Sequence, residues 1–167
     1  MSWSTKARVF WPLAATVLLT DCATKRIAET VLAPAYVPHI VLGDFVRLTL
    51  AYNPGAAMSL SLGPYSRLGF SLLAAAAIIV LGVLYRRLPK AAMLAAVGLA
   101  LVTGGALGNA LDRLRSPRGV VDFIDVGIGG IRFWTFNVAD IAITVGAAAL
   151  AFSMARPRAG AREGRSL

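Results

Sequence analysis

Hydrophobic residues run in long, nearly uncharged blocks along this chain, and the blocks have the length of membrane-spanning helices. Four windows stand out: 9–28, 68–85, 91–111 and 136–155. A helix needs about 20 mostly apolar residues to cross a bilayer. The first window contains Asp21 and Lys25, but we interpret it as a retained helix, because a cleaved secretory leader would not account for the three windows that follow. The pattern predicts a membrane protein with an all-α core of four transmembrane helices.

Three segments between these windows have the pattern of strands. Segment 46–52 alternates apolar and polar residues, which is the period of a half-buried strand, and an Asn-Pro-Gly turn follows it. Segments 120–126 and 131–136 are two further strand candidates joined by a glycine-rich turn. We therefore expect a small extracytoplasmic β-sheet built from the connecting segments 29–67 and 112–135.

Composition and charge indicate the class of protein and its orientation. Hydrophobic residues make up 57% of the chain, and the formal net charge is +9. The basic residues bracket the apolar windows, so they do not indicate nucleic-acid binding. The N-terminus, the 86–90 loop and the tail 156–167 are basic and almost free of acids, whereas the other side is nearly balanced. Because basic loops face the cytoplasm, we expect cytoplasmic termini, one domain over residues 1–155 and a disordered tail.

Polar residues gather at one end of the predicted bundle. The first and third windows end outside and the fourth begins there, so their terminal residues share one level near the outer surface. The residues expected at that level are Asp21, Asn53, Asp112, Asp122 and Asp140. An ionisable group inside an apolar window, such as Asp140, is energetically costly and marks a candidate functional site.

Asp122 and Asp140 flank the predicted hairpin and form the candidate catalytic pair. Two carboxylates within hydrogen-bond reach tend to share one proton. The ionised member can take a proton from an attacking water while the protonated member polarises a carbonyl oxygen. The hypothesis is aspartyl proteolysis at a membrane surface, a reaction that needs neither a metal ion nor a cofactor.

Five motifs, taken in order, resemble those of the bacterial lipoprotein signal peptidases, the signal peptidase II family. They are DCATK (21–25), NPGAAM (53–58), GGALGNALDR (104–113), VVDFID (120–125) and FNVAD (136–140). The resemblance implies an aspartyl endopeptidase of the bacterial inner membrane, which removes signal peptides from prolipoproteins by cutting before a diacylglyceryl-modified cysteine. Its implied partners are these lipid-modified substrates and membrane lipids. A monomer suffices for a site built within one chain.

The same resemblance assigns the site residues. Asp122 and Asp140 match the catalytic dyad. The positions that match residues shaping and holding the site are Asp21, Lys25, Asn53, Gly55, Gly105, Asn109, Asp112, Arg113, Asn137 and Ala139. One departure is Met58, where the family more often has an aromatic residue. This departure concerns the shape of the pocket and not its chemistry.

Some of these residues also have structural interpretations. Asp21 and Lys25 are four residues apart and can pair on one helix face. Asp112 and Arg113 fit a structural ion pair or a contact with the substrate backbone better than catalysis. His39 has no second histidine or nearby cysteine with which to form a metal site.

Three other functions fit parts of the pattern. A small transporter or ion-coupled carrier would also use intramembrane Asp and Asn, although window 68–85 offers no charged residue for a conduit. A Ser/Lys peptidase would use Ser59 or Ser61 with Lys25. A metal-dependent hydrolase would use the same carboxylates with Mg²⁺ or Zn²⁺ and would lose activity in excess chelator, a loss that we do not expect.

Overall fold

The computed structural model describes residues 4–55 and 63–155, which form four long helices and a four-stranded sheet. The helices are α1 (Thr5–Val31), α2 (Ser66–Arg87), α3 (Met93–Arg115) and α4 (Val138–Ala155). The strands are β1 (Pro38–Leu42), β2 (Val46–Asn53), β3 (Val120–Ile128) and β4 (Ile131–Arg132). A short 3-10 helix, Gly63–Tyr65, precedes α2. Met58, Ser59, Ser61 and the tail 156–167 lie outside the described residues.

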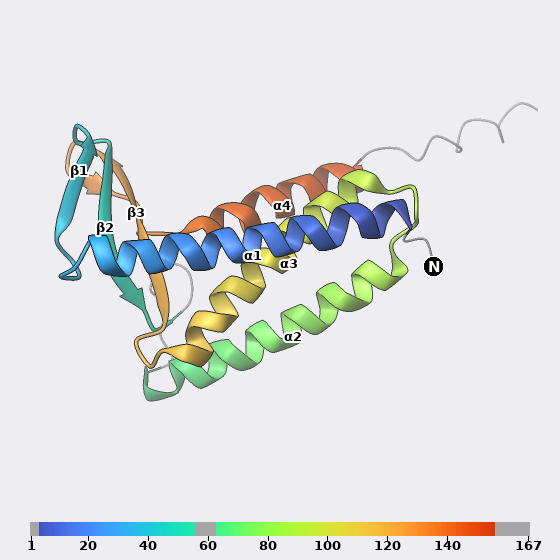
Figure 1. Ribbon diagram of the computed structural model, residues 1–167, viewed down its shortest axis with the longest axis horizontal. Helices are drawn as coiled ribbons and strands as arrows, with labels where there is room; N and C mark the ends of the chain where they lie inside the picture. Colours follow the sequence, from blue (N-terminus) through green and yellow to red (C-terminus); the bar gives the residue numbers. More distant parts are fainter. Residues whose placement is uncertain (1–3, 56–62, 156–167) are drawn as a thin grey trace, which may run out of the picture.

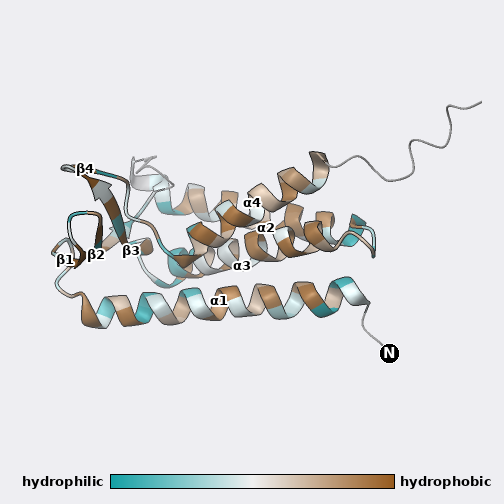
Figure 2. Ribbon diagram, turned by 90° about the horizontal axis from the view of Figure 1, so that it is seen from above, coloured by the Kyte–Doolittle hydropathy of each residue, from teal (hydrophilic) through white to brown (hydrophobic). Residues whose placement is uncertain are grey.

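The sheet lies at one end of the helices, which run along one another (Figure 1). α3 is central and packs against α1, α2 and α4. Within the described part of the chain, α2, α3 and α4 are the three helices long and apolar enough to cross a membrane, which confirms three of the predicted windows as apolar helices. α1 has 27 residues and carries hydrophilic bands along its length (Figure 2). Its passage through a membrane stays a prediction.

Glycines let α3 approach its neighbours closely. A Cβ on Gly104 would lie 2.7 Å from the carbonyl oxygen of Ala14 in α1, and a Cβ on Gly105 would lie 2.5 Å from the carbonyl oxygen of Ala139 in α4. Both distances are too short for a real side chain, so these small residues set the distance between the helices. The close packing brings α1, α3 and α4 together at the end that carries the sheet.

The third helix continues beyond its apolar window. The window ends at residue 111, but α3 runs to Arg115. Charged residues end a hydrophobic window without ending a helix, and arginines are favourable in the last turn. Asn109 therefore lies on the same helix as Asp112 and Arg113, three and four residues before them, which places it on a surface adjacent to each of them.

The sheet has the order β1-β2-β3-β4, with antiparallel neighbours. β2 matches the strand expected at 46–52. The alternation rule misses β1 because all five of its residues are exposed. Its first residue, Pro38, is tolerated because β1 is an edge strand, where proline does not remove a hydrogen bond from the middle of the sheet. The strand expected at 131–136 is too long: β4 ends at Arg132, and only an isolated bridge joins Phe136 to Ile124 as the chain crosses to α4.

A buried apolar cluster joins the sheet to the end of α1. Leu32 follows α1, Leu50 comes from β2, and Val121 and Phe123 come from β3; all four are at least 91% buried. Burying a large apolar side chain contributes about 1.5–3 kcal/mol. The cluster fixes β3 against the helices, and it thereby fixes the position of Asp122.

Candidate active site

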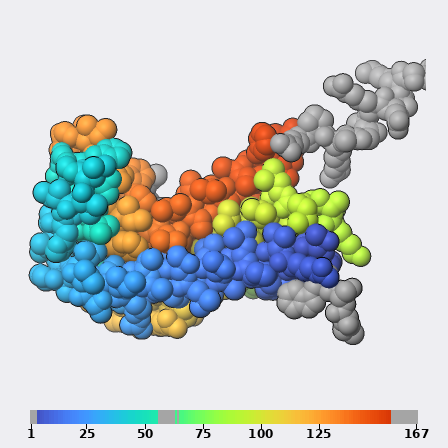
Figure 3. Space-filling model, turned by 45° about the horizontal axis from the view of Figure 1, so that its top comes forward, coloured from blue at the N-terminus to red at the C-terminus, as the bar shows by residue number. Residues whose placement is uncertain are grey.

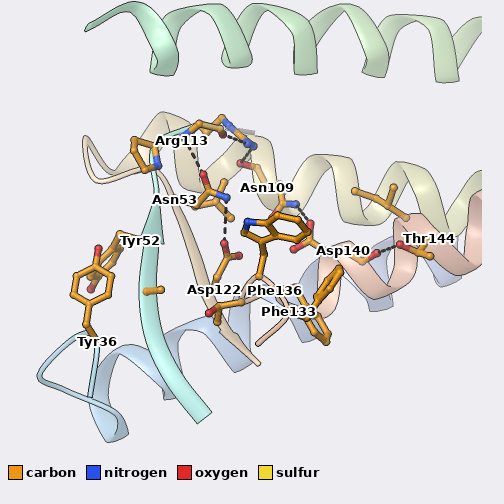
Figure 4. Close-up of a pocket in the computed structure, with 17 residues that line it drawn as sticks. Tyr36, Tyr52, Asn53, Asn109, Arg113, Asp122, Phe133, Phe136, Asp140 and Thr144 are labelled. Atoms are coloured by element: carbon orange, nitrogen blue, oxygen red, sulfur yellow. Dashed lines mark hydrogen bonds between the residues drawn. The ribbon is translucent and has the colours of Figure 1, made fainter. Parts of the chain in front are cut away.

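A cavity of about 580 Å³ beside the sheet is lined by both candidate catalytic aspartates. Asp122 reaches it from β3, and Asp140 reaches it from the first turn of α4 (Figure 4). The surface is hollowed at the junction between the sheet and α4 (Figure 3). The other predicted site residues that line the cavity are Asn53, Gly55, Asn109 and Arg113. A cavity of this size accommodates a peptide segment.

The remaining predicted residues lie behind the cavity wall and hold the residues that line it. They are Asp21, Lys25, Gly105, Asp112, Asn137 and Ala139. The structure thus brings all twelve predicted positions to one end of the bundle, six of them lining the cavity and six lying behind it.

The motif FNVAD builds the start of α4 as a reciprocal helix cap. The side-chain oxygen of Asn137 accepts the backbone N–H of Asp140 at 3.0 Å, and Oδ2 of Asp140 accepts the backbone N–H of Asn137 at 3.2 Å. This exchange satisfies two backbone donors that the first helical turn would leave unpaired. It also holds the Asp140 carboxylate in one orientation at the edge of the cavity.

Asn137 contacts the second aspartate as well. Its Nδ2 donates to Oδ1 of Asp122 at 2.7 Å, and Asn53 Nδ2 donates to Oδ2 of Asp122 at a longer 3.4 Å. Asn53 reaches Asp122 because β2 pairs with β3 in a register that sets Ala51 opposite Asp122 and Asn53 on the diagonal. A single fully buried residue, Asn137, therefore bridges the two carboxylates.

The environment of Asp122 favours its protonated form. Burial in the wall of the cavity raises the pKa of Asp122 to about 7, and the neighbouring charge of Asp140 contributes to the increase. Hydrogen bonds from Asn137 and Asn53 and the charge of Lys25 lower the pKa by smaller amounts. Desolvation disfavours the charged form of a carboxyl group, and a second carboxylate does so too. The pair is thus suited to hold one proton near neutral pH.

Lys25 is the centre of a buried ion cluster behind the cavity, and only 2% of it is exposed. Its ammonium lies 2.8 Å from Asp21 Oδ2 and 2.8 Å from Asp112 Oδ2, and it donates to Asn109 Oδ1 at 2.8 Å. The pairing of Lys25 with Asp21 confirms the predicted contact on one helix face. Asp112 pairs with Lys25, not with its neighbour Arg113, because α3 turns the Asp112 side chain toward α1.

Asp21 connects this cluster to the start of α4. Its Oδ1 accepts the backbone N–H of Ala139 at 2.9 Å, so an aspartate from α1 supplements the cap that Asn137 provides. Gly108 on α3 makes room for it, since a Cβ at that position would collide with the Asp21 carboxylate. The fully buried Ala139 also packs against Gly105.

Arg113 fixes the backbone at the mouth of the cavity. Its guanidinium donates to the carbonyl oxygen of Gly55 at 2.9 Å and to that of Asn109 at 3.1 Å. The Gly55 N–H in turn donates to Asn53 Oδ1 at 3.0 Å, which turns the Asn53 amide nitrogen toward Asp122. Through these contacts, Arg113 and Gly55 help to hold the Asn53 amide nitrogen as a hydrogen-bond donor to Asp122.

Aromatic side chains form much of the rest of the cavity wall, and of these only Phe136 belongs to a sequence motif, FNVAD. They are Tyr36, Tyr52, Phe133, Trp134 and Phe136. The Arg118 guanidinium stacks on the Tyr52 ring at 3.9 Å from its centroid. The signal available in the sequence is the aromatic pair Phe133-Trp134, which two residues separate from the glycine-rich turn, since aromatic residues are typical of ligand pockets.

A second aspartate of VVDFID, Asp125, holds the hairpin that carries these aromatic residues. It is 8% exposed and accepts hydrogen bonds from Arg132 Nε at 2.9 Å and from the Thr49 hydroxyl at 3.1 Å. These bonds join β2, β3 and β4. The sequence presents Asp125 only as a charge near Asp122, and its structural role depends on strand pairing.

We expect Asn137→Ser and Asn137→Ala to separate the two roles of this residue. The serine hydroxyl can still accept the N–H of Asp140, whereas both variants lack the amide nitrogen that donates to Asp122. The unfolding free energy of the alanine variant should be lower than that of the serine variant by about 1 kcal/mol, and both variants should lose peptidase activity. Thermal unfolding in detergent and a cleavage assay measure the two effects, and full activity of Asn137→Ser would contradict the role given to the amide.

Comparison with known proteins identifies the family. A model described as Signal peptidase (SPase) II matches residues 13–156. A lipoprotein signal peptidase of Pseudomonas putida is 44% identical over 145 residues, covering 85% of this chain and 84% of that relative. A lipoprotein signal peptidase of Paraburkholderia phymatum is 39% identical over 152 residues, covering 90% of this chain and 89% of that relative.

Solved structures agree with this result. A bacterial membrane enzyme determined by the in meso method at 2.3 Å resolution superposes with a TM-score of 0.77 at 28% identity, covering 93% of this chain and 92% of the other. A second, at 1.9 Å resolution, gives a TM-score of 0.74 at 30% identity, covering 87% and 92%. The chain belongs to the signal peptidase II family, and it is therefore a membrane peptidase.

Proposed function

We propose that this protein is an aspartyl endopeptidase that removes signal peptides from prolipoproteins, cutting on the N-terminal side of a diacylglyceryl-modified cysteine. The observation that carries the proposal is the bridged pair of aspartates in one cavity at the end of three apolar helices. The relatives named lipoprotein signal peptidases support the substrate class.

The proposed reaction uses Asp122 and Asp140 as an acid and a base. The ionised carboxylate takes a proton from water as the water oxygen attacks the scissile carbonyl carbon, and the protonated carboxyl gives its proton to the carbonyl oxygen. The tetrahedral intermediate then returns a hydroxyl proton to the carboxylate that protonated the carbonyl oxygen, re-forms the carbonyl and breaks the C–N bond. The carboxyl that took the proton of water delivers it to the leaving nitrogen, which restores the starting state of the pair.

The proposed setting is the outer surface of the bacterial inner membrane. Four spans, at about 9–28, 68–85, 91–111 and 136–155, place both termini in the cytoplasm and the sheet outside. Asp140 lies in the first turn of α4, where a substrate bond just beyond an apolar signal helix would reach it. Partial exclusion of bulk water there strengthens the electrostatic interactions of the pair.

A transporter using the same aspartates is the main alternative. Among the described residues, the buried charged groups are Asp21, Lys25, Asp122 and Asp125. The last two lie on β3, and the first two contact Ala139 at the start of α4 and Asp112, which itself accepts a backbone N–H of β3. A conduit would need polar groups along the helices, and the interior of α2 has none that is charged over 68–85. The arrangement therefore favours a site for chemistry at one level.

The test of this function compares two substrates that differ only in the lipid. Purified protein in detergent is incubated with a diacylglyceryl-modified prolipoprotein and with its unlipidated form, and the products are identified by mass spectrometry. We expect cleavage of the lipidated form immediately before the modified cysteine. Equal cleavage of both forms, or of neither, would contradict the proposed substrate class.

A further inference from the structure

Lys25 is a buried charge that does not line the cavity, so the proposed reaction gives it no direct contact with substrate. The ammonium group has three hydrogens, and three acceptors lie 2.8 Å from it: Asp21 Oδ2, Asp112 Oδ2 and Asn109 Oδ1. Two of these acceptors are carboxylates that compensate the buried charge. The third is a neutral amide, and that amide leads to the cavity.

The ammonium fixes which way the Asn109 amide points. Asn109 Oδ1 accepts from Lys25 and also from Asn137 Nδ2 at 3.2 Å, so both neighbours of this atom are donors. Rotating the amide by half a turn would set its NH₂ group against the ammonium. The Asn109 Nδ2 is therefore directed at Asp140 Oδ1, to which it donates at 2.8 Å.

The two aspartates consequently have unequal support for a negative charge. Asp140 accepts from the Asn109 amide and from the Asn137 backbone N–H, and it lies at a helix N-terminus, where a negative charge is favoured. Asp122 accepts from Asn137 Nδ2, but that nitrogen shares two hydrogens among three acceptors, the others being Val121 O at 3.2 Å and Asn109 Oδ1. Its other side-chain donor, Asn53 Nδ2, is at a longer 3.4 Å. Asp122 is also only 4% exposed.

We propose that Lys25 and Asn109 are positioning residues that keep Asp140 ionised, so that Asp122 carries the proton of the resting pair. This inference rests on the proposed function. Asp140 is then the base that receives the proton of water, and Asp122 is the acid that gives its proton to the carbonyl oxygen. The raised pKa of Asp122 agrees with this assignment.

The other charged groups around the pair are two cations and two carboxylates, which balance each other. Arg113 on α3 interacts electrostatically with Asp112, Asp122 and Asp140, and Lys25 faces Asp21 and Asp112 from within the ion cluster. Two cations therefore face two carboxylates in addition to the pair. Removing Lys25 would leave the carboxylates of Asp21 and Asp112 uncompensated and would release the Asn109 amide that it orients. Removing Asn109 would take away a side-chain donor of Asp140.

The experiment labels protonated carboxyl groups directly and needs no substrate. Purified full-length protein in detergent is treated with dicyclohexylcarbodiimide, which adds to protonated carboxyl groups in apolar surroundings, and the adducts are mapped by peptide mass spectrometry from pH 5 to 9. We expect the adduct on Asp122 in preference to Asp140, decreasing as the pH rises through about 7. An adduct predominantly on Asp140, or equally on both, would overturn the assignment.

Variants test whether Asn109 and Lys25 cause the asymmetry. Asn109→Ala should raise the ratio of Asp140 to Asp122 labelling by about tenfold, which corresponds to the loss of one hydrogen bond to a charged group. Lys25→Met should give a smaller rise, because it releases the Asn109 amide but also removes a charge that lowers the pKa of Asp122. Because this variant can also prevent folding by leaving Asp21 and Asp112 unpaired, Asn109→Ala is the deciding variant. An unchanged ratio in folded Asn109→Ala would overturn the positioning role.

A lysine at the opposite end of the bundle provides the control. Lys6 donates to the carbonyl oxygens of Tyr85 at 2.9 Å and Leu88 at 2.7 Å. Lys6→Met therefore removes a lysine without touching the site, and the labelling ratio should stay at that of the unmodified chain.

The proposed function and this inference can fail separately. Protein that does not cleave lipidated prolipoprotein contradicts the function. Protein that cleaves it but is labelled on Asp140 contradicts only this inference.

Discussion

Replacing Asp140 by asparagine should lower the rate of prolipoprotein cleavage by at least about 10³-fold, and Asp122→Asn should do the same. General acid–base catalysis by a positioned side chain contributes about 10²–10⁴-fold, and an amide can neither accept the proton of water nor donate a proton to the carbonyl oxygen. Asparagine keeps the size of the side chain, so the fold should remain. Single-turnover cleavage of lipidated substrate measures the effect.

Matched variants separate this result from a general loss of charge. Asp44 lies between β1 and β2 with its side chain 48% exposed, and Asp44→Asn should keep activity close to that of the unmodified chain. Ser59→Ala and Ser61→Ala should also remain active, whereas a Ser/Lys peptidase would lose activity with one of them. Cleavage that survives Asp140→Asn would refute the aspartyl mechanism.

Gly108→Ala should destabilise the protein, although alanine is the better helix former. The new Cβ would collide with the Asp21 carboxylate, which binds Lys25 and caps Ala139. Overpacking of this kind costs about 1–3 kcal/mol, and displacement of Asp21 should reduce activity as well. Thermal unfolding in detergent and the cleavage assay report the two effects.

Gly82→Ala is the control for this substitution. Gly82 lies within α2, and a Cβ there would meet nothing within 4 Å. Alanine should leave the stability unchanged or raise it by up to about 1 kcal/mol. Equal stability of the two variants would mean that the contact between Gly108 and Asp21 does not hold the helices together.

The sequence predicts those parts of the fold that depend on local pattern. Apolar windows give α2, α3 and α4, and alternation gives β2. Pattern fails where an element has no contrast between its faces, as in the fully exposed β1. It also fails at Asp112, where hydropathy ends the window while the helix continues to Arg115.

Motif order predicts the polar members of the site, but most of their contacts depend on how the helices and strands pack. The spacing of DCATK indicates the pairing of Asp21 with Lys25, since both lie on one helix. The bond from Asp21 to the Ala139 N–H joins residues 118 positions apart, and it exists only because glycines bring α1, α3 and α4 together. Likewise, strand register alone places Asn53 beside Asp122.

The central claim is that Asp122 and Asp140 act together on one water molecule. A crystal structure of the substrate-free protein below pH 7, at a resolution that shows ordered water, tests it most directly. We expect one water within about 2.6–3.2 Å of a carboxyl oxygen of both aspartates. Carboxyl groups that bind separate waters, at a separation that no single water can bridge, would contradict the account.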